Sequence, residues 1–225
     1  FVLVAVTGVL HGFTLTPFAR ALGLAGAAVP GALLVGGSRF SLALAQALGK
    51  AEVPVLIADP NRTRLRAARQ AGVNRFYGDV LSEAAEHKLE LAQYGRIIAL
   101  SDNDAYNTLV TTDLGPEFGR DNIFQLARHK GDLARNALPS SLGGRAFVAG
   151  HNFDELEANI RAGHDMRCTR LSEEYGPEDW QADAPEALMV MAIDPKGNPR
   201  LPSGDKTLPL TADWQVIWLD PKGTR

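Results

Sequence analysis

The chain has 225 residues, of which 45% are hydrophobic and 22% charged, enough for one large or two small globular domains with a core. The formal net charge of -3 excludes a strongly basic surface of the kind that binds nucleic acid. The single cysteine, Cys168, excludes a disulfide framework and a thiolate zinc site, and fits a reducing, cytoplasmic setting.

The first ten residues, FVLVAVTGVL, carry no charge and are rich in aliphatic side chains. A helix of this length covers roughly 15 Å, about half of the hydrocarbon core of a bilayer. No basic residue precedes the run, whereas a signal peptide has a basic start. Two interpretations stay open: a buried core segment, or the last half of a membrane helix.

The stretch VTGVLHGFTLTPFARALGL at 6–24 resembles the end of the final membrane helix of monovalent cation:proton antiporters of the sodium/hydrogen exchanger type. Arg20 is its first positive charge, as expected where a helix leaves the membrane on the cytoplasmic side. The resemblance implies that residues 1–24 end the last transmembrane helix of a multi-pass inner-membrane protein. Residues 25–30 would be a linker to a region on the cytoplasmic side. The matching residues are His11, Gly12, Thr14, Pro17, Ala19, Leu22, Gly23 and Leu24.

From residue 32 onward, short apolar runs alternate with stretches of helical periodicity. Apolar runs without strict alternation are typical of strands buried on both faces, with helices as crossovers. The pattern predicts an α/β fold, a Rossmann-like doubly wound parallel sheet of six strands. The expected strands are 32–36, 53–59, 74–79, 96–101, 122–128 and 145–150, and the expected helices are 38–49, 61–71, 82–93, 104–118 and 132–141.

The turn after the first strand is similar to a dinucleotide-binding turn with fewer glycines. The pattern G-x-G-x-x-G would place glycine at 36, 38 and 41, where the chain has Gly36, Ser38 and Ser41. Gly36 permits a tight turn, and the amides of residues 38–40 would open a helix whose positive end favours phosphate. Ser38 adds a hydroxyl donor, and Ser41 is small enough for partial close packing of helix on strand. Arg39 would reach a phosphate or stay solvated.

Asp59 ends the second apolar run, about 20 residues further on, where the dinucleotide fingerprint expects a carboxylate for the ribose hydroxyls. Arg62 and Arg64 lie nearby and would offset its repulsion of a ribose 2′-phosphate. A second interpretation stays open, that Asp59-Pro60-Asn61 begins the next helix with Asn61 as its N-cap.

The ends of the third and fourth runs also carry polar residues, Asp79 and then Ser101, Asp102 and Asn103. In a doubly wound sheet these residues lie at the edge where ligands bind. The ordered series LLVGGSR, VLIADPN, YGDV and IIALSDNDAYN resembles the nucleotide-binding domain that regulates potassium conductance and Trk-type potassium uptake. The resemblance implies a cytosolic sensor at 31–150 that binds an adenine nucleotide such as NAD(H), ATP, ADP or AMP. The residues expected at the ligand are Gly36, Gly37, Ser38, Arg39, Phe40, Asp59, Pro60, Asn61, Arg62, Asp79, Ser101 and Asp102.

The last third of the chain, 151–225, is expected to form a small α+β lobe. It begins with a helix at 152–163 and contains a strong hairpin-turn signal at 194–198. The last strand is expected at the edge of its sheet, with Trp214 and Trp218 on one face as packing residues. The expected strands are 166–172, 186–194 and 213–220.

The sequence shows no catalytic constellation. The histidines lack metal-ligand spacing, and there is no G-x-S-x-G elbow. We therefore expect a non-enzymatic regulatory region, homodimeric and attached to its own transmembrane antiporter domain, in which nucleotide occupancy biases Na+ or K+ transport. Two alternatives stay open: a soluble NAD(P)-dependent oxidoreductase, and a nucleotide-free assembly platform.

Overall fold

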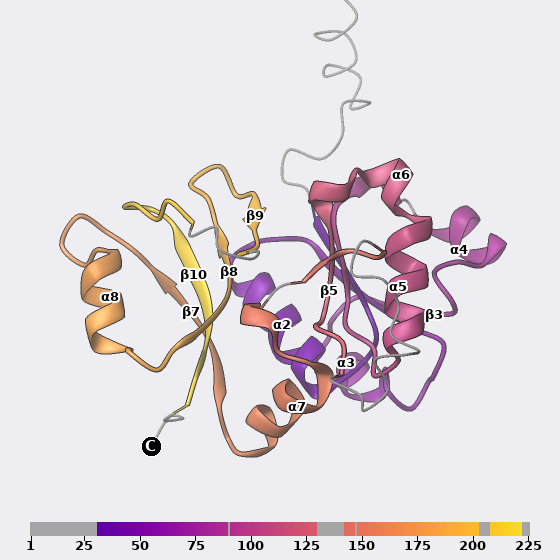
Figure 1. Cartoon of the computed structure of the whole chain (residues 1–225), viewed down its shortest axis with the longest axis horizontal. Coiled ribbons are helices and arrows are strands. Elements are labelled where there is room, and N and C mark those ends of the chain that lie inside the picture. Colours follow the sequence, from indigo (N-terminus) through magenta and orange to yellow (C-terminus); the bar gives the residue numbers. More distant parts are fainter. Residues whose placement is uncertain (1–30, 90, 130–141, 147, 203–207, 222–225) are drawn as a thin grey trace, which may run out of the picture.

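The computed structural model describes residues 31–89, 91–129, 142–146, 148–202 and 208–221 (Figure 1). The expected end of a membrane helix and the linker at 1–30, and the expected helix at 132–141, lie outside these ranges. Within them, no helix is both long enough and apolar enough to cross a bilayer.

The first sheet has six parallel strands in the order β3-β2-β1-β4-β5-β6. This confirms the doubly wound α/β fold, and the strand order reverses between β1 and β4. The carboxyl ends of the strands on both sides of this reversal meet at one edge, where such sheets bind ligands. The strands are β1 (Gly31–Val35), β2 (Val55–Asp59), β3 (Arg75–Tyr77), β4 (Tyr94–Ala99), β5 (Ile123–Gln125) and β6 (Arg145–Ala146).

Helices connect these strands, and several are shorter than the sequence predicts. The helix expected at 61–71 begins only at Arg66, with Leu65 instead of Asn61 as its N-cap; residues 62–65 form a turn, in which the Asn61 Oδ1 accepts from the Thr63 amide. The helix expected at 82–93 ends at Lys88, because Leu89 is already extended. The elements are α2 (Arg39–Lys50), α3 (Arg66–Gln70), α4 (Glu83–Lys88), η1 (Leu91–Gln93), α5 (Asp104–Asp113), α6 (Gly115–Phe118), η2 (Arg120–Asn122) and η3 (Val148–Gly150).

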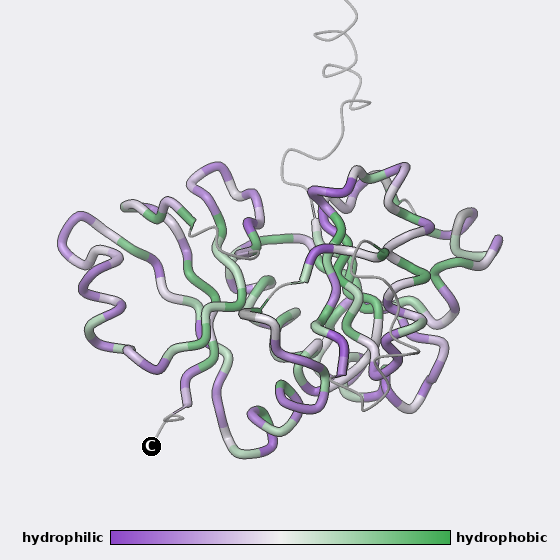
Figure 2. Tube along the Cα trace, in the orientation of Figure 1, coloured by the Kyte–Doolittle hydropathy of each residue, from purple (hydrophilic) through white to green (hydrophobic). Residues whose placement is uncertain are grey.

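The first sheet is buried on both faces, which explains its continuous apolar runs. In β1, Ala32 and Leu34 join a cluster with α2, whereas Leu33 and Val35 join a second cluster with α5. Figure 2 shows these strands as hydrophobic, with hydrophilic loops around them. The strands are therefore fixed from both sides.

The second sheet is antiparallel, in the order β7-β10-β8-β9. The expected edge position of the last strand is wrong, because β10 pairs with both β7 and β8. The hairpin turn is confirmed, with Asp194 Oδ1 accepting from the amides of Lys196 and Asn198. The elements are α7 (Phe153–Arg161), β7 (Asp165–Arg170), α8 (Pro177–Asp183), β8 (Leu188–Ile193), β9 (Pro199–Arg200) and β10 (Gln215–Asp220).

Helix α2 lies between the two sheets (Figure 1). Its Leu44 and Leu48 share one core cluster with β1, β8 and β10. The opposite face of the second sheet packs against α8, where Trp214 and Trp218 are buried as the sequence predicts for packing residues. Both halves of the described structure are thus built on α2, the helix that starts at the ligand edge of the first sheet.

Candidate functional site

The turn after β1 requires glycine at its first position. Gly36 has φ +116, and a Cβ there would lie 2.6 Å from the Ser101 amide nitrogen and 2.8 Å from the Leu100 carbonyl carbon. The ends of β1 and β4 therefore touch through backbone atoms. A side chain at this position would push the two strand ends apart.

The two serines that replace glycines support the turn from within. The hydroxyl of Ser41, a fully buried residue, donates to the Gly36 carbonyl at 2.6 Å. Ser38 is the N-cap of α2, and its Oγ accepts from the Ser41 amide at 3.0 Å. The two hydroxyl oxygens lie 3.0 Å apart. Because the Ser41 hydroxyl already donates to the Gly36 carbonyl, the Ser38 hydroxyl is the donor in the bond between the two serines. The Ser38 hydroxyl, expected as a donor to a ligand, is therefore committed to the turn.

Protein carboxylates accept from two backbone amides after β1, and one of them, at Phe40, belongs to the expected phosphate cradle of residues 38–40. Asp59 Oδ2 accepts from the Gly37 amide at 2.7 Å. Glu157 Oε1, on α7, accepts from the Phe40 amide at 2.8 Å, and Glu157 is only 6% exposed. The Phe40 amide, which the sequence predicts near a phosphate, thus has a protein acceptor on α7 in this structure.

A cleft of about 380 Å³ opens at the carboxyl edge of the first sheet. It lies where the strand order reverses, and the ends of β1, β2, β3 and β4 all contribute to it. Seven of the predicted site residues line the cleft: Gly36, Asp59, Pro60, Asn61, Asp79, Ser101 and Asp102; Arg64, Asn103 and Tyr106 line it as well.

Asp59 is the most buried carboxylate of the cleft, at 3% exposure. One oxygen holds the Gly37 amide and the other accepts from the Asn61 amide at 2.6 Å. It therefore fixes the turns after β1 and β2 relative to each other. Each carboxylate oxygen has further lone-pair capacity for a ligand hydroxyl.

Asp79 and Tyr106 close one wall of the cleft. The Tyr106 hydroxyl donates to Asp79 Oδ1 at 2.7 Å, and the Leu81 amide donates to the same oxygen at 3.0 Å. Burial, followed by the hydrogen bond to Asp79, raises the pKa of Tyr106 above its ordinary value. The Tyr106 hydroxyl thus stays protonated at physiological pH and donates a hydrogen bond to Asp79.

Arg64 and Asp102 form an ion pair at the cleft. The hydrogen bond to Asp102 raises the pKa of Arg64, and the same bond lowers the pKa of Asp102. The sequence places two arginines, Arg62 and Arg64, near Asp59 without distinguishing them. Arg64, in the turn before α3, lines the cleft, whereas the Arg62 guanidinium lies 4.4 Å from the centre of the Tyr77 ring.

The remaining predicted residues do not line the cleft. Gly37 is buried against Arg64, where an added Cβ would lie 3.1 Å from the Arg64 Cβ. Arg39 is exposed at the start of α2. Among the residues that the structure describes, no group of three histidine, cysteine or acidic side chains could hold a metal ion. The predicted residues outside the cleft lining are Gly37, Ser38, Arg39, Phe40 and Arg62.

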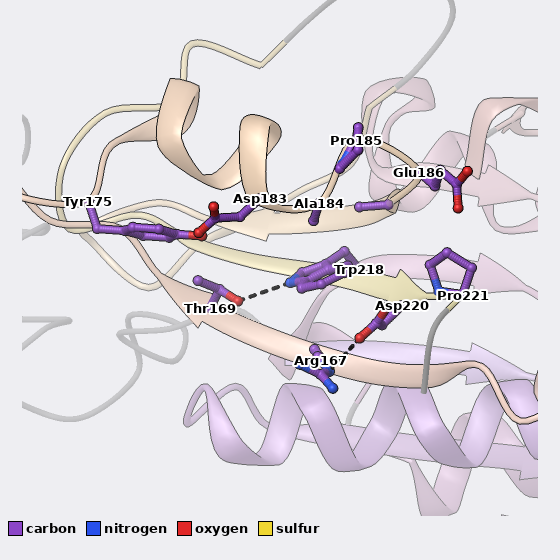
Figure 3. Close-up of a pocket in the computed structure, with 11 residues that line it drawn as sticks. Arg167, Thr169, Tyr175, Asp183, Ala184, Pro185, Glu186, Trp218, Asp220 and Pro221 are labelled. Atoms are coloured by element: carbon purple, nitrogen blue, oxygen red, sulfur yellow. Dashed lines mark hydrogen bonds and ion pairs between the residues drawn. The ribbon is translucent and has the colours of Figure 1, made fainter. Parts of the chain in front are cut away.

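A second cavity, of about 450 Å³, lies on the second sheet beside Trp218 (Figure 3). The Trp218 indole donates to Thr169 Oγ1 at 3.0 Å, and Arg167 pairs with Asp220 at 3.0 Å. Trp218 is 6% exposed, so most of its ring is already covered by protein. No motif in the sequence predicts a site at this cavity.

Comparison with known protein families finds a match over strands β1 to β5 of the first sheet. Residues 32–133 match the TrkA-N domain. The Rossmann-like sheet thus has the TrkA-N fold over this segment. The match covers the glycine turn, Asp59, Asp79 and Asp102, whereas Glu157 and the second sheet lie beyond it.

Among solved structures, the chain is similar to one described as the GsuK channel bound to NAD, with 16% identity and a TM-score of 0.41 over 87% of this chain and 36% of that chain. It is also similar to the crystal structure of the GsuK RCK domain, with 14% identity and a TM-score of 0.41 over 85% of this chain and 45% of that chain. The chain thus spans less than half the length of either. No curated protein matches it.

Proposed function

We propose that this chain is the cytosolic nucleotide-sensing region of a monovalent cation:proton antiporter, in which ligand occupancy biases Na+ or K+ transport. The observation that carries the ligand is the cleft, which lies at the strand-order reversal of a TrkA-N domain. The resemblance of residues 6–24 to the last helix of such antiporters supports the transporter class.

The cleft suits the ribose of an adenine nucleotide. Asp59 and Asp79 present carboxylate oxygens at the ends of neighbouring strands, β2 and β3. Carboxylates at these positions accept hydrogen bonds from ribose hydroxyls, which are charge-assisted and strong. We propose NAD(H) as the ligand, with ATP, ADP and AMP as the other members of the class.

We propose regulation without catalysis. Hydride transfer needs an acid or base poised near the operating pH and close to the nicotinamide. Tyr106, which has an acidic proton, is half-buried and bound to Asp79, and its pKa is raised further away from neutral pH. The Arg64 and Asp102 charges neutralise each other, which suits a structural pair better than an acid–base pair. From the resemblance to Trk-type regulators, we also propose that the functional unit is a homodimer attached to its own transmembrane domain.

Ligand binding to the 225-residue chain tests the proposal. Thermal shift and calorimetry with NAD, NADH, NADP, ATP, ADP and AMP should find a ligand, and one at about 100 times its Kd adds about 2.7 kcal/mol of stability. Asp79→Asn should weaken binding, whereas Asp113→Asn, an exposed carboxylate outside the cleft lining, should not. Binding of none of the six would favour the assembly platform, and steady NADH oxidation with a substrate would favour the oxidoreductase.

A further inference from the structure

We infer that Glu157 sets ligand selectivity at the start of α2, the helix that follows the Gly36 turn of the cleft: it holds the Phe40 amide, which a phosphate would use, so a phosphate-bearing nucleotide binds by displacing it, whereas a nucleoside does not. This inference rests on the proposed nucleotide-binding function. It also gives that function a direct route from the ligand to the second sheet, because Glu157 belongs to α7.

The hydrogen bond between Glu157 and the Phe40 amide places a protein carboxylate where the phosphate of a ligand is expected. Helix α2 has twelve residues, and its N-terminus carries partial positive charge on its first amides. Glu157 Oε1 accepts from the Phe40 amide at 2.8 Å, across 117 residues of sequence. The residue is more than nine-tenths buried, so this hydrogen bond offsets part of the cost of removing its carboxylate from water.

The other amides of the turn leave little room for an alternative phosphate position. The Gly37 amide donates to Asp59, and the Ser41 amide donates to Ser38 Oγ. In the part of the chain that the structure describes, the Ser38 and Arg39 amides remain without a protein acceptor. A phosphate on those two amides would lie next to the Phe40 amide, and so beside the Glu157 carboxylate. Two anions at such short range repel each other strongly away from bulk water.

Helix α7 links the Phe40 amide, for which Glu157 and a ligand phosphate would compete, to the second sheet. It is fixed at its start by a capping box, in which Asn152 and Glu155 exchange hydrogen bonds, and Leu156 packs in the shared core. Only a short turn separates α7 from β7, which pairs with β10 along its whole length. Movement of Glu157 away from α2 therefore moves an element that is continuous with the second sheet.

The experiment compares phosphate-bearing and phosphate-free ligands on charge variants of one residue. Affinities of AMP, ATP, NAD and adenosine are measured by calorimetry on the 225-residue chain and on its Glu157→Gln and Glu157→Ala variants. Glu157→Gln keeps the shape and an acceptor for the Phe40 amide, so it guards against loss of folding. Glu173→Gln, at an exposed carboxylate, is the matched control for charge.

We expect Glu157→Gln to bind AMP, ATP and NAD at least about tenfold more tightly than the natural chain, with the adenosine affinity within about twofold. Hydrogen exchange over residues 153–161 should rise when ATP is added to the natural chain, and should not change with adenosine. Unchanged nucleotide affinities, or an equal gain for adenosine, would overturn the inference and leave the proposed function standing. If no chain binds any of the four ligands, the proposed function fails and the inference fails with it.

Discussion

Arg64 and Asp102 bridge the two halves of the first sheet across the point where its strand order reverses. Arg64 Nη1 lies 2.9 Å from Asp102 Oδ1, and Arg64 Nη2 lies 2.6 Å from Asp102 Oδ2. Arg64 follows β2 and Asp102 follows β4, so the pair connects the loops on either side of β1. A second carboxylate, Asp59, lies 4.0 Å from the same guanidinium.

We predict that breaking this pair changes stability little. The two side chains are 37% and 45% exposed, and ion pairs of this kind contribute about 0–1 kcal/mol. In urea unfolding at pH 7, a double-mutant cycle of Arg64→Gln and Asp102→Asn should give a coupling energy in that range, smaller at 1 M salt. Because the pKa of Asp102 is lowered in the folded chain, its contribution is present at neutral pH and is lost as pH falls through the folded value. A coupling that persists fully at pH 2 would contradict this assignment.

Gly36→Ala should be strongly destabilising for two separable reasons. The added Cβ meets backbone atoms of Leu100 and Ser101, and φ is positive. Gly72→Ala is the matched control, because its φ is +71 but nothing lies within 4 Å of its Cβ, so it reports the left-handed strain alone, about 1–2 kcal/mol. Gly49→Ala, inside α2 with open space around it, should stabilise by about 0.5–1 kcal/mol. Equal losses at Gly36 and Gly72 in thermal unfolding would exclude the contact between strand ends.

Asp59→Ala should weaken both the fold and the ligand site. The side chain accepts from two backbone amides inside the structure, and removing it leaves the Gly37 amide buried without its acceptor. Leaving one such group unpaired costs about 1–3 kcal/mol. Asp59→Asn keeps one acceptor oxygen and should lose less stability, while still removing the charge that favours ribose hydroxyls. Ligand affinity is therefore compared on the Asn variant, and an unchanged affinity there would place ribose recognition elsewhere, with Asp79 as the next candidate.

The sequence predicts the first sheet well because its strands are buried on both faces and read as uninterrupted apolar runs. The same logic brings Asp59, Asp79 and Ser101 to one edge, since the carboxyl ends of parallel strands meet there. The sequence does not predict that β10 pairs with both β7 and β8. Whether a strand lies inside a sheet or at its edge depends on pairing with residues far along the chain.

Contacts between distant segments also explain what the sequence misses in the site. The Phe40 amide looks available for phosphate when only the local turn is considered. Glu157 reaches it from a helix that the sequence predicts correctly, but whose packing against α2 no local pattern specifies. Arg64 is likewise placed by the turn at 62–65 that precedes α3, in which the Thr63 amide donates to the Asn61 Oδ1.

His129 should make the junction between the first sheet and α7 sensitive to pH. Its Nδ1 lies 2.9 Å from Asp104 at the start of α5, and its Nε2 lies 3.1 Å from Asp154 at the start of α7. The hydrogen bond to Asp104, with a smaller contribution from Asp154, raises the pKa of His129 above its ordinary 6.5. A raised folded-state pKa means that the bridge contributes fully below the unfolded value and is lost as pH rises through the folded value. The gap in melting temperature between the natural chain and His129→Gln should therefore be larger at pH 6 than at pH 8.5, a range in which surface carboxylates stay ionised. His87→Gln, at an exposed histidine of α4, is the matched control and should show no such gap. A gap that is constant across this range, or that grows with pH, would show that His129 holds α5 and α7 together without its charge.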